Sequence, residues 1–111
     1  MTSVQIERSK TGVLLGCTAK GHAGYAERGS DIVCSAVTVL IRTTLQVLSE
    51  LPALNLETDT SKRGSIGFKV LKGFPSGIEE KLKYAGDFLQ VGLESVAKEF
   101  PDNLKLVINS L

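Results

Sequence analysis

The sequence predicts one α+β domain over residues 1–111, with two helices packed on a mixed, mainly antiparallel sheet in the order ββαββαβ. Two observations predict this fold. Short stretches of alternating apolar and polar residues, typical of half-buried strands, flank two long segments without that alternation. In addition, 111 residues with 42% hydrophobic and 23% charged side chains can form one hydrophobic core without disulfides.

The N-terminal quarter of the chain predicts a hairpin and a loop. Val4 and Ile6 alternate with polar residues, and a more apolar strand at 13–19 follows a turn at 9–12. Segment 21–29 has three glycines in nine residues and no sustained period, so we expect a loop there.

A long helix is predicted from Ser30 or Asp31 to Leu51, because the segment lacks Gly and Pro and either residue can cap it. Its many β-branched residues weaken helicity, so tertiary burial must stabilise it. Its polar residues form one narrow stripe, which consists of Ser35, Thr38, Arg42, Gln46 and Ser49. A helix that is otherwise apolar is covered on more than one face, and we expect the second cover to be a partner subunit of a homodimer.

The next predicted elements are two strands joined by a polar turn. Alternating residues end one strand near Asp59, and Ile66, Phe68 and Val70 form the returning strand after the turn at 60–64.

A second helix and a last strand complete the prediction. Ser76 and Glu79 have the spacing of a capping box, and an amphipathic helix continues from there to Pro101. Gly86 and Gly92 lower its helix propensity but permit close packing. Alternating apolar residues at 104–108 form the strand.

Charge and composition restrict the class of protein. The formal net charge of +1 gives no electrostatic footprint for direct nucleic-acid binding or for an anionic membrane. The polar residues at the N-terminus do not resemble a signal peptide, and no unbroken apolar run approaches the roughly 20 residues that span a bilayer. We therefore expect a cytoplasmic protein whose two cysteines are thiols.

One group of residues has the composition of a catalytic site. His22 is the only histidine, and Cys34 follows in the first turn of the long helix with Asp31 just before it. A cysteine attacks as the thiolate, which a helix N-terminus and a neighbouring imidazolium both stabilise. Backbone N–H groups around Cys34 are expected to point out of the helix start, where they can receive an oxyanion. By spacing alone, a surface histidine and a buried cysteine explain these residues as well.

The residues Gly21-His22-Ala23-Gly24 and Gly29-Ser30-Asp31-Ile32-Val33-Cys34-Ser35 resemble the signature of the ribosomal-processing cysteine protease family, Prp. That signature is a Gly-His opening, a short loop, and Gly-x-Asp-Ile-Val-Cys followed by small residues. The length of the chain and its element order also match the family.

The resemblance implies a homodimeric cytoplasmic cysteine endopeptidase that needs no cofactor. By similarity, Cys34 is the nucleophile and His22 the general base. The implied substrate is the precursor of the bacterial large-subunit ribosomal protein numbered twenty-seven, from which such enzymes remove an N-terminal extension.

Two parts of the signature have alternative interpretations. Asp31 either orients His22, as the third member of a triad does, or only caps the helix. Gly21, Gly24 and Gly29 are either hinges of a loop that closes over a peptide or ordinary turn glycines.

Three other functions are compatible with the residues. The first is a non-enzymatic module that binds ribosomal components. The second is thiol redox chemistry, for which Cys17 is the available resolving thiol, although its alternating neighbours indicate a core residue. The third is a zinc site made by Cys17, His22, Asp31 and Cys34, but the close Cys-x-x-Cys pairs of structural zinc are missing from the sequence.

Overall fold

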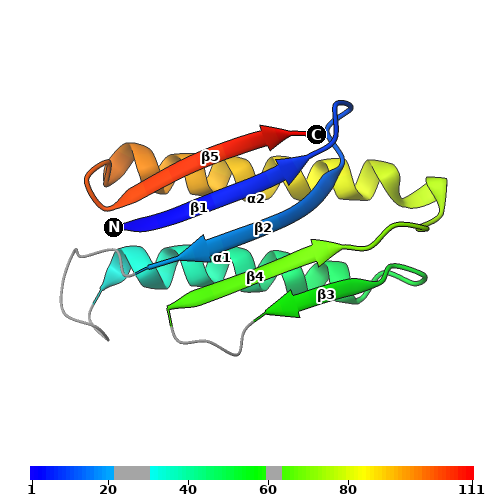
Figure 1. Cartoon of the computed structure of the whole chain (residues 1–111), viewed down its shortest axis with the longest axis horizontal. Coiled ribbons are helices and arrows are strands. Elements are labelled where there is room, and N and C mark those ends of the chain that lie inside the picture. The colour runs from blue at the N-terminus through cyan, green and yellow to red at the C-terminus, as the bar shows by residue number, and fades with distance from the viewer. Residues whose placement is uncertain (22–30, 60–63) are drawn as a thin grey trace.

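A computed structural model describes residues 1–21, 31–59 and 64–111 of the chain, and Figure 1 shows its two layers. The predicted α+β class and the order ββαββαβ are confirmed. The elements are β1 (Thr2–Arg8), β2 (Leu14–Lys20), α1 (Ile32–Ser49), β3 (Leu56–Asp59), β4 (Ser65–Val70), the short 3₁₀ turn η1 (Ser76–Ile78), α2 (Glu79–Glu99) and β5 (Leu104–Ser110).

The sheet has the strand order β3-β4-β2-β1-β5. Of the strand pairs that the structure describes, only β1 with β5 is parallel, so the sheet is mixed and mainly antiparallel, as predicted. The register pairs Val4 with Ala19 and Ile6 with Cys17. Because side chains alternate along a strand, this register places the apolar residues of both strands on one face.

Both helices lie on that same face of the sheet, and no helix of the described residues lies on the opposite face (Figure 1). The core between the layers is apolar and its largest fully buried side chains come from both sheet and helices. They are Val4, Ile6, Leu14, Cys17, Val33, Ile41, Leu48, Leu82, Leu89 and Leu93.

Helix α1 packs one side into the core and exposes the other. Among the described residues it is the one helix long and apolar enough, with a mean hydropathy of 1.7, to cross a membrane by length and composition alone. A core helix of a soluble fold passes the same test, and α1 packs here against α2 and β4. The predicted polar stripe is exposed except at half-buried Thr38, and Ile32, Val39 and Val47 are exposed beside it.

The predicted capping box at the start of α2 is wrong. Pro75 is extended and begins a separate 3₁₀ turn, in which the Ile78 N–H donates to the Pro75 carbonyl at 3.2 Å. Ser76 is therefore the first residue of that 3₁₀ turn and not the N-cap of α2. The N-cap of α2 is Ile78, which makes no side-chain hydrogen bond there. Glu79 becomes the first residue of α2 and not the third, so its side chain is out of place for a reciprocal cap.

The two glycines of α2 do permit close packing. A Cβ at Gly92 would lie 2.8 Å from the Leu40 side chain of α1, and one at Gly86 would lie 2.9 Å from the Arg8 guanidinium. Arg8 uses that space to reach across from β1, where it donates to Asp87 at 2.8 Å and Gln90 at 2.9 Å. These hydrogen bonds attach the C-terminal end of β1 to α2.

Candidate active site

The first turn of α1 is capped by Asp31. Its carboxylate oxygen Oδ1 accepts hydrogen bonds from the Val33 N–H at 2.9 Å and the Cys34 N–H at 3.1 Å. Asp31 is only 3% exposed, so these bonds are shielded from water. Short acidic side chains are favoured at this position because they satisfy donors that have no partner inside the helix. The structure thus shows the capping interaction, and any orientation of His22 by Asp31 lies outside the described residues.

The cap changes one expectation about the site. Two of the backbone N–H groups that were expected to receive an oxyanion already donate to the Asp31 carboxylate. A carboxylate at this point also offsets the partial positive charge of the helix N-terminus. The expectation that these two donors are open to an oxyanion is therefore wrong for this arrangement of the helix start.

The Cys34 side chain lies half-buried beneath the first residue of β1. Its Sγ is 3.9 Å from the Thr2 hydroxyl oxygen. Both groups carry a proton, so either one can donate in this hydrogen bond. Thr2 is 3% exposed, and its N–H donates to the Asn103 carbonyl at 3.0 Å. The sulfur is thus held at the junction of the helix start and the central strands of the sheet.

Gly21, the residue before His22, is hydrogen-bonded to the same Thr2 side chain that contacts Cys34. Its carbonyl accepts a hydrogen bond from the Thr2 hydroxyl at 3.3 Å, and its N–H donates to the Gly64 carbonyl at 2.9 Å. Its φ of +91° and the 2.7 Å that would separate a Cβ from the Met1 carbonyl both require glycine. His22, Gly24 and Gly29 lie outside the described residues, so the hinge interpretation of these glycines stays a prediction.

Cys17 has the opposite environment. It points into the core from the middle of β2 and is completely buried, which confirms the interpretation of Cys17 as a core residue. Burial, with a smaller contribution from the charge of Glu7, raises the pKa of the Cys17 thiol to about 12. In the described part of the chain, no group of three or more His, Cys, Asp and Glu residues is arranged to hold a metal ion.

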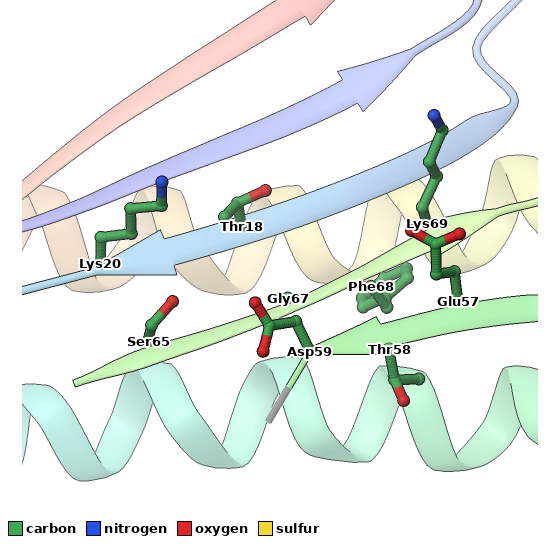
Figure 2. Close-up of a pocket in the computed structure, with 9 residues that line it drawn as sticks. All are labelled: Thr18, Lys20, Glu57, Thr58, Asp59, Ser65, Gly67, Phe68 and Lys69. Atoms are coloured by element: carbon green, nitrogen blue, oxygen red, sulfur yellow. The ribbon is translucent and has the colours of Figure 1, made fainter. Parts of the chain in front are cut away.

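The open face of the sheet carries a shallow pocket, which Figure 2 shows over β2, β3 and β4. Its floor is Gly67, where a larger side chain would approach the Cys17 carbonyl. Charged side chains of both signs surround it, namely Lys20, Lys69, Glu57 and Asp59. Among the described residues of the predicted site, Cys34 does not line this pocket, because it belongs to the helix layer on the other face. His22 lies outside the described residues.

The sequence profile of a family described as cysteine protease Prp matches residues 1–105. The chain belongs to this family. It is therefore a cysteine protease of the ribosomal-processing type. This membership decides against a non-enzymatic binding module.

The proteins to which this chain is similar align with nearly its whole length. The ribosomal processing cysteine protease Prp of Bacillus subtilis (strain 168) is 26% identical over 113 residues, covering 98% of each chain. A crystal structure from Streptococcus mutans has a TM-score of 0.77 at 26% identity and covers 100% of this chain and 96% of its own. The Prp protease from S. aureus, solved with a covalently linked product peptide, has a TM-score of 0.83 at 18% identity, covers 98% of this chain and 100% of its own, and shares the fold.

Among the described residues, Thr2 contacts Cys34 and Gly21 and was not singled out by the sequence analysis. The signal was available in the pattern of the first strand, because Thr2 has the same parity as Val4 and Ile6. A polar residue on the core-facing side of a strand needs a hydrogen-bond partner. That requirement alone did not identify Cys34 and Gly21 as the partners.

Proposed function

We propose that this Prp-family chain is an endopeptidase in which Cys34 is the nucleophile and His22 is the general base. The observation that carries the proposal is the placement of Cys34, half-buried in the first turn of α1 and in contact with Thr2, in a chain of this protease family. The Gly21 carbonyl accepts from the same Thr2 hydroxyl, so the residue before His22 is tied to the neighbourhood of the sulfur. This connection supports a Cys-His pair.

The proposed substrate is the N-terminal extension of a ribosomal protein precursor. The S. aureus relative has been crystallised with a substrate peptide and with a covalently linked product peptide. Acyl transfer to a cysteine is one reaction that joins a peptide covalently to an enzyme. The resemblance of the residues around Cys34 to the family signature supports the large-subunit ribosomal protein numbered twenty-seven as the processed protein. A cytoplasmic location is proposed together with that substrate.

The proposed reaction is acyl transfer in two steps. His22 accepts the Cys34 proton, and the thiolate attacks the carbonyl carbon of the peptide bond to give a tetrahedral oxyanion. The C–N bond breaks as His22 returns the proton to the departing amine, which is the new N-terminus of the ribosomal protein. The extension remains on Cys34 as a thioester. Water, deprotonated by His22, then attacks the thioester and releases the extension as a carboxylic acid with the thiol restored.

Activation of the sulfur depends mainly on His22 in this proposal. The helix N-terminus contributes less than usual, because the Asp31 carboxylate occupies the Val33 and Cys34 N–H groups. An imidazolium formed by proton transfer is then the principal positive charge that stabilises the thiolate.

The test is cleavage of a peptide that spans the processing junction of the precursor. Cys34→Ala and His22→Ala each abolish turnover while the circular dichroism of the fold is unchanged. Alkylation by iodoacetamide across pH separates the roles, because His22→Ala moves the reaction of Cys34 to more alkaline pH. Turnover at the wild-type rate in either variant would overturn the proposed dyad.

The oligomer proposed for the enzyme is a homodimer formed through the outer face of the helix layer. Large apolar side chains there are more than half exposed, and they come from both helices: Ile32, Val39 and Val47 of α1 with Tyr84, Phe88 and Val91 of α2. Exposed large apolar side chains on two helices that pack against each other are typical of a subunit interface. A second copy presents the same surface, so an isologous pair covers both.

Sedimentation tests the dimer. The wild type gives a mass near twice 11.9 kDa, and Phe88→Glu gives a monomer because a charge would be buried in the interface. Val107→Glu is the matched control, since Val107 is a partly exposed apolar residue of β5 outside the helix layer. A wild type that sediments as a monomer at micromolar concentration would contradict the dimer.

A further inference from the structure

The side chain of Thr2 links the sulfur of Cys34 to the backbone that leads into His22. Its Oγ1 is 3.9 Å from Cys34 Sγ and 3.3 Å from the Gly21 carbonyl oxygen. The backbone of Thr2 is fixed on one side by its pairing with Leu104 of β5 and by the N–H bond to Asn103. The hydroxyl therefore stands at a defined place between the two groups.

A count of protons shows what this hydroxyl can do. A threonine hydroxyl has one proton to donate and can accept through its lone pairs. The Gly21 carbonyl can only accept, so the Thr2 proton points to Gly21 in the bond that the structure shows. With the proton placed there, Thr2 Oγ1 is an acceptor toward Cys34, which matches a protonated thiol.

Ionisation of the sulfur reverses this arrangement. A thiolate has no proton and can only accept, so the contact persists as a hydrogen bond only if Thr2 turns its proton from Gly21 to the sulfur. Hydrogen bonds to a charged acceptor are about twice as strong as neutral ones. The exchange therefore stabilises the thiolate and, at the same time, frees the carbonyl of Gly21.

We propose that Thr2 is a positioning residue of this protease, whose hydroxyl orients the Cys34 sulfur and donates to it when the sulfur is ionised. This inference rests on the proposed function of Cys34 as the nucleophile. Thr2 does not contact the substrate carbonyl in this account and exchanges no proton with it. It acts through Cys34, by holding the sulfur in one orientation and by stabilising its charge.

A purely structural role makes a different prediction. Thr44 of α1 is the natural comparison, because it is buried to a similar degree, at 4% exposed, and its hydroxyl donates to the Leu40 carbonyl at 2.8 Å. Loss of either hydroxyl removes a buried hydrogen bond. Only the loss at Thr2 is expected to alter the chemistry of Cys34.

The experiment compares Thr2→Val, Thr2→Ala and Thr2→Ser with Thr44→Val. Steady-state cleavage of the junction peptide gives kcat and KM, and iodoacetamide gives the rate of Cys34 alkylation across pH. The two variants without a hydroxyl are expected to lose about tenfold in kcat, with KM within twofold, which matches the loss of one hydrogen bond to a charged group. Their alkylation profile moves to more alkaline pH, because the thiolate has lost a donor.

The remaining variants are the controls. Thr2→Ser restores both kcat and the alkylation profile, and Thr44→Val leaves both at the wild-type values. Asp31 is unchanged in every variant, and intact mass checks that all have the same N-terminus. Thr2→Val and Thr2→Ala both remove the hydroxyl but differ in side-chain volume, so the test can still be read if one of the two variants does not fold.

The outcomes separate this inference from the proposed function. Wild-type kcat and alkylation profile in a folded Thr2→Val or Thr2→Ala would overturn the role of Thr2, as would a serine variant that fails to restore them. A wild type that cleaves no junction peptide contradicts the proposed substrate, and the alkylation profiles still decide whether Thr2 acts on Cys34.

Discussion

The middle of β2 and the first turn of α1 each hold one cysteine, and the two have opposite surroundings. Cys17 is fully buried among apolar side chains, which raises the pKa of its thiol to about 12. Cys34 is half-buried, its N–H donates to the Asp31 carboxylate, and its sulfur contacts the Thr2 hydroxyl. The comparison shows that position in the fold, and not residue type, decides which thiol is available for chemistry.

The largest expected difference between the two thiols is in catalysis. Cys34→Ala removes the nucleophile and lowers turnover of the junction peptide by at least about a thousandfold. Cys17→Ala leaves kcat within about threefold of wild type, because Cys17 lies in the core, but costs about 1 kcal/mol of unfolding free energy through the small cavity it leaves. Turnover and urea denaturation measure the two effects. A Cys17→Ala enzyme that folds without activity would show that the comparison is wrong.

The second difference is in the stability of the fold at alkaline pH. The pKa of Cys17 is raised from 9.0 to about 12 by folding, so the folded chain keeps a proton that the unfolded chain releases in this range. The free energy of unfolding therefore falls as pH rises from about 9 to about 12, by up to about 1.4 kcal/mol per pH unit for this one group.

Cys17→Ala lacks this contribution. The difference in unfolding free energy between wild type and Cys17→Ala at each pH therefore isolates the Cys17 thiol, because the lysines and tyrosines are the same in both proteins. Urea denaturation of both proteins at pH 8, 9 and 10 gives the difference. Parallel stability curves for wild type and Cys17→Ala would mean that the Cys17 thiol is not held protonated by the core.

A smaller effect is expected at the cap of α1. Asp31→Asn keeps an oxygen that accepts from Val33 and Cys34, so the helix start and turnover are largely retained. Asp31→Ala leaves both N–H groups without this acceptor and destabilises the fold by about 1 kcal/mol. Thermal unfolding and junction-peptide cleavage of both variants are the measurements. A loss of a hundredfold or more in kcat for Asp31→Asn would favour the triad interpretation, in which the charge of Asp31 orients His22.

The fold was predictable because its periodicities are strong and local. Alternation identified the strands, and a long segment without Gly or Pro identified α1, which ends at Ser49 and not at Leu51. The start of α2 was mispredicted because Pro75 caps a separate 3₁₀ turn. Ser76 belongs to that turn, and the helix begins only after it. A capping pattern in sequence does not show which turn the cap belongs to.

The site was predictable only where its residues are neighbours in sequence. Asp31 and Cys34 lie in one helical turn, so their proximity follows from the helix itself. Thr2 reaches Cys34 through the pairing of β1 with β5 and the packing of α1 beneath the sheet. No spacing rule in the chain encodes that contact between residues 32 positions apart. The occupation of the Cys34 N–H by Asp31 likewise depends on a cap geometry that the sequence allows but does not specify.

The central claim, that Cys34 and not Cys17 supplies the catalytic thiol, is tested most directly by the stoichiometry of inactivation. Iodoacetamide is added to the folded enzyme at neutral pH, and aliquots are assayed for residual turnover and for the fraction of each cysteine modified by mass spectrometry. We predict that activity falls in direct proportion to modification of Cys34, reaching zero at one adduct per chain, while Cys17 stays unmodified until the protein is unfolded. Activity that persists after complete modification of Cys34 would contradict the account.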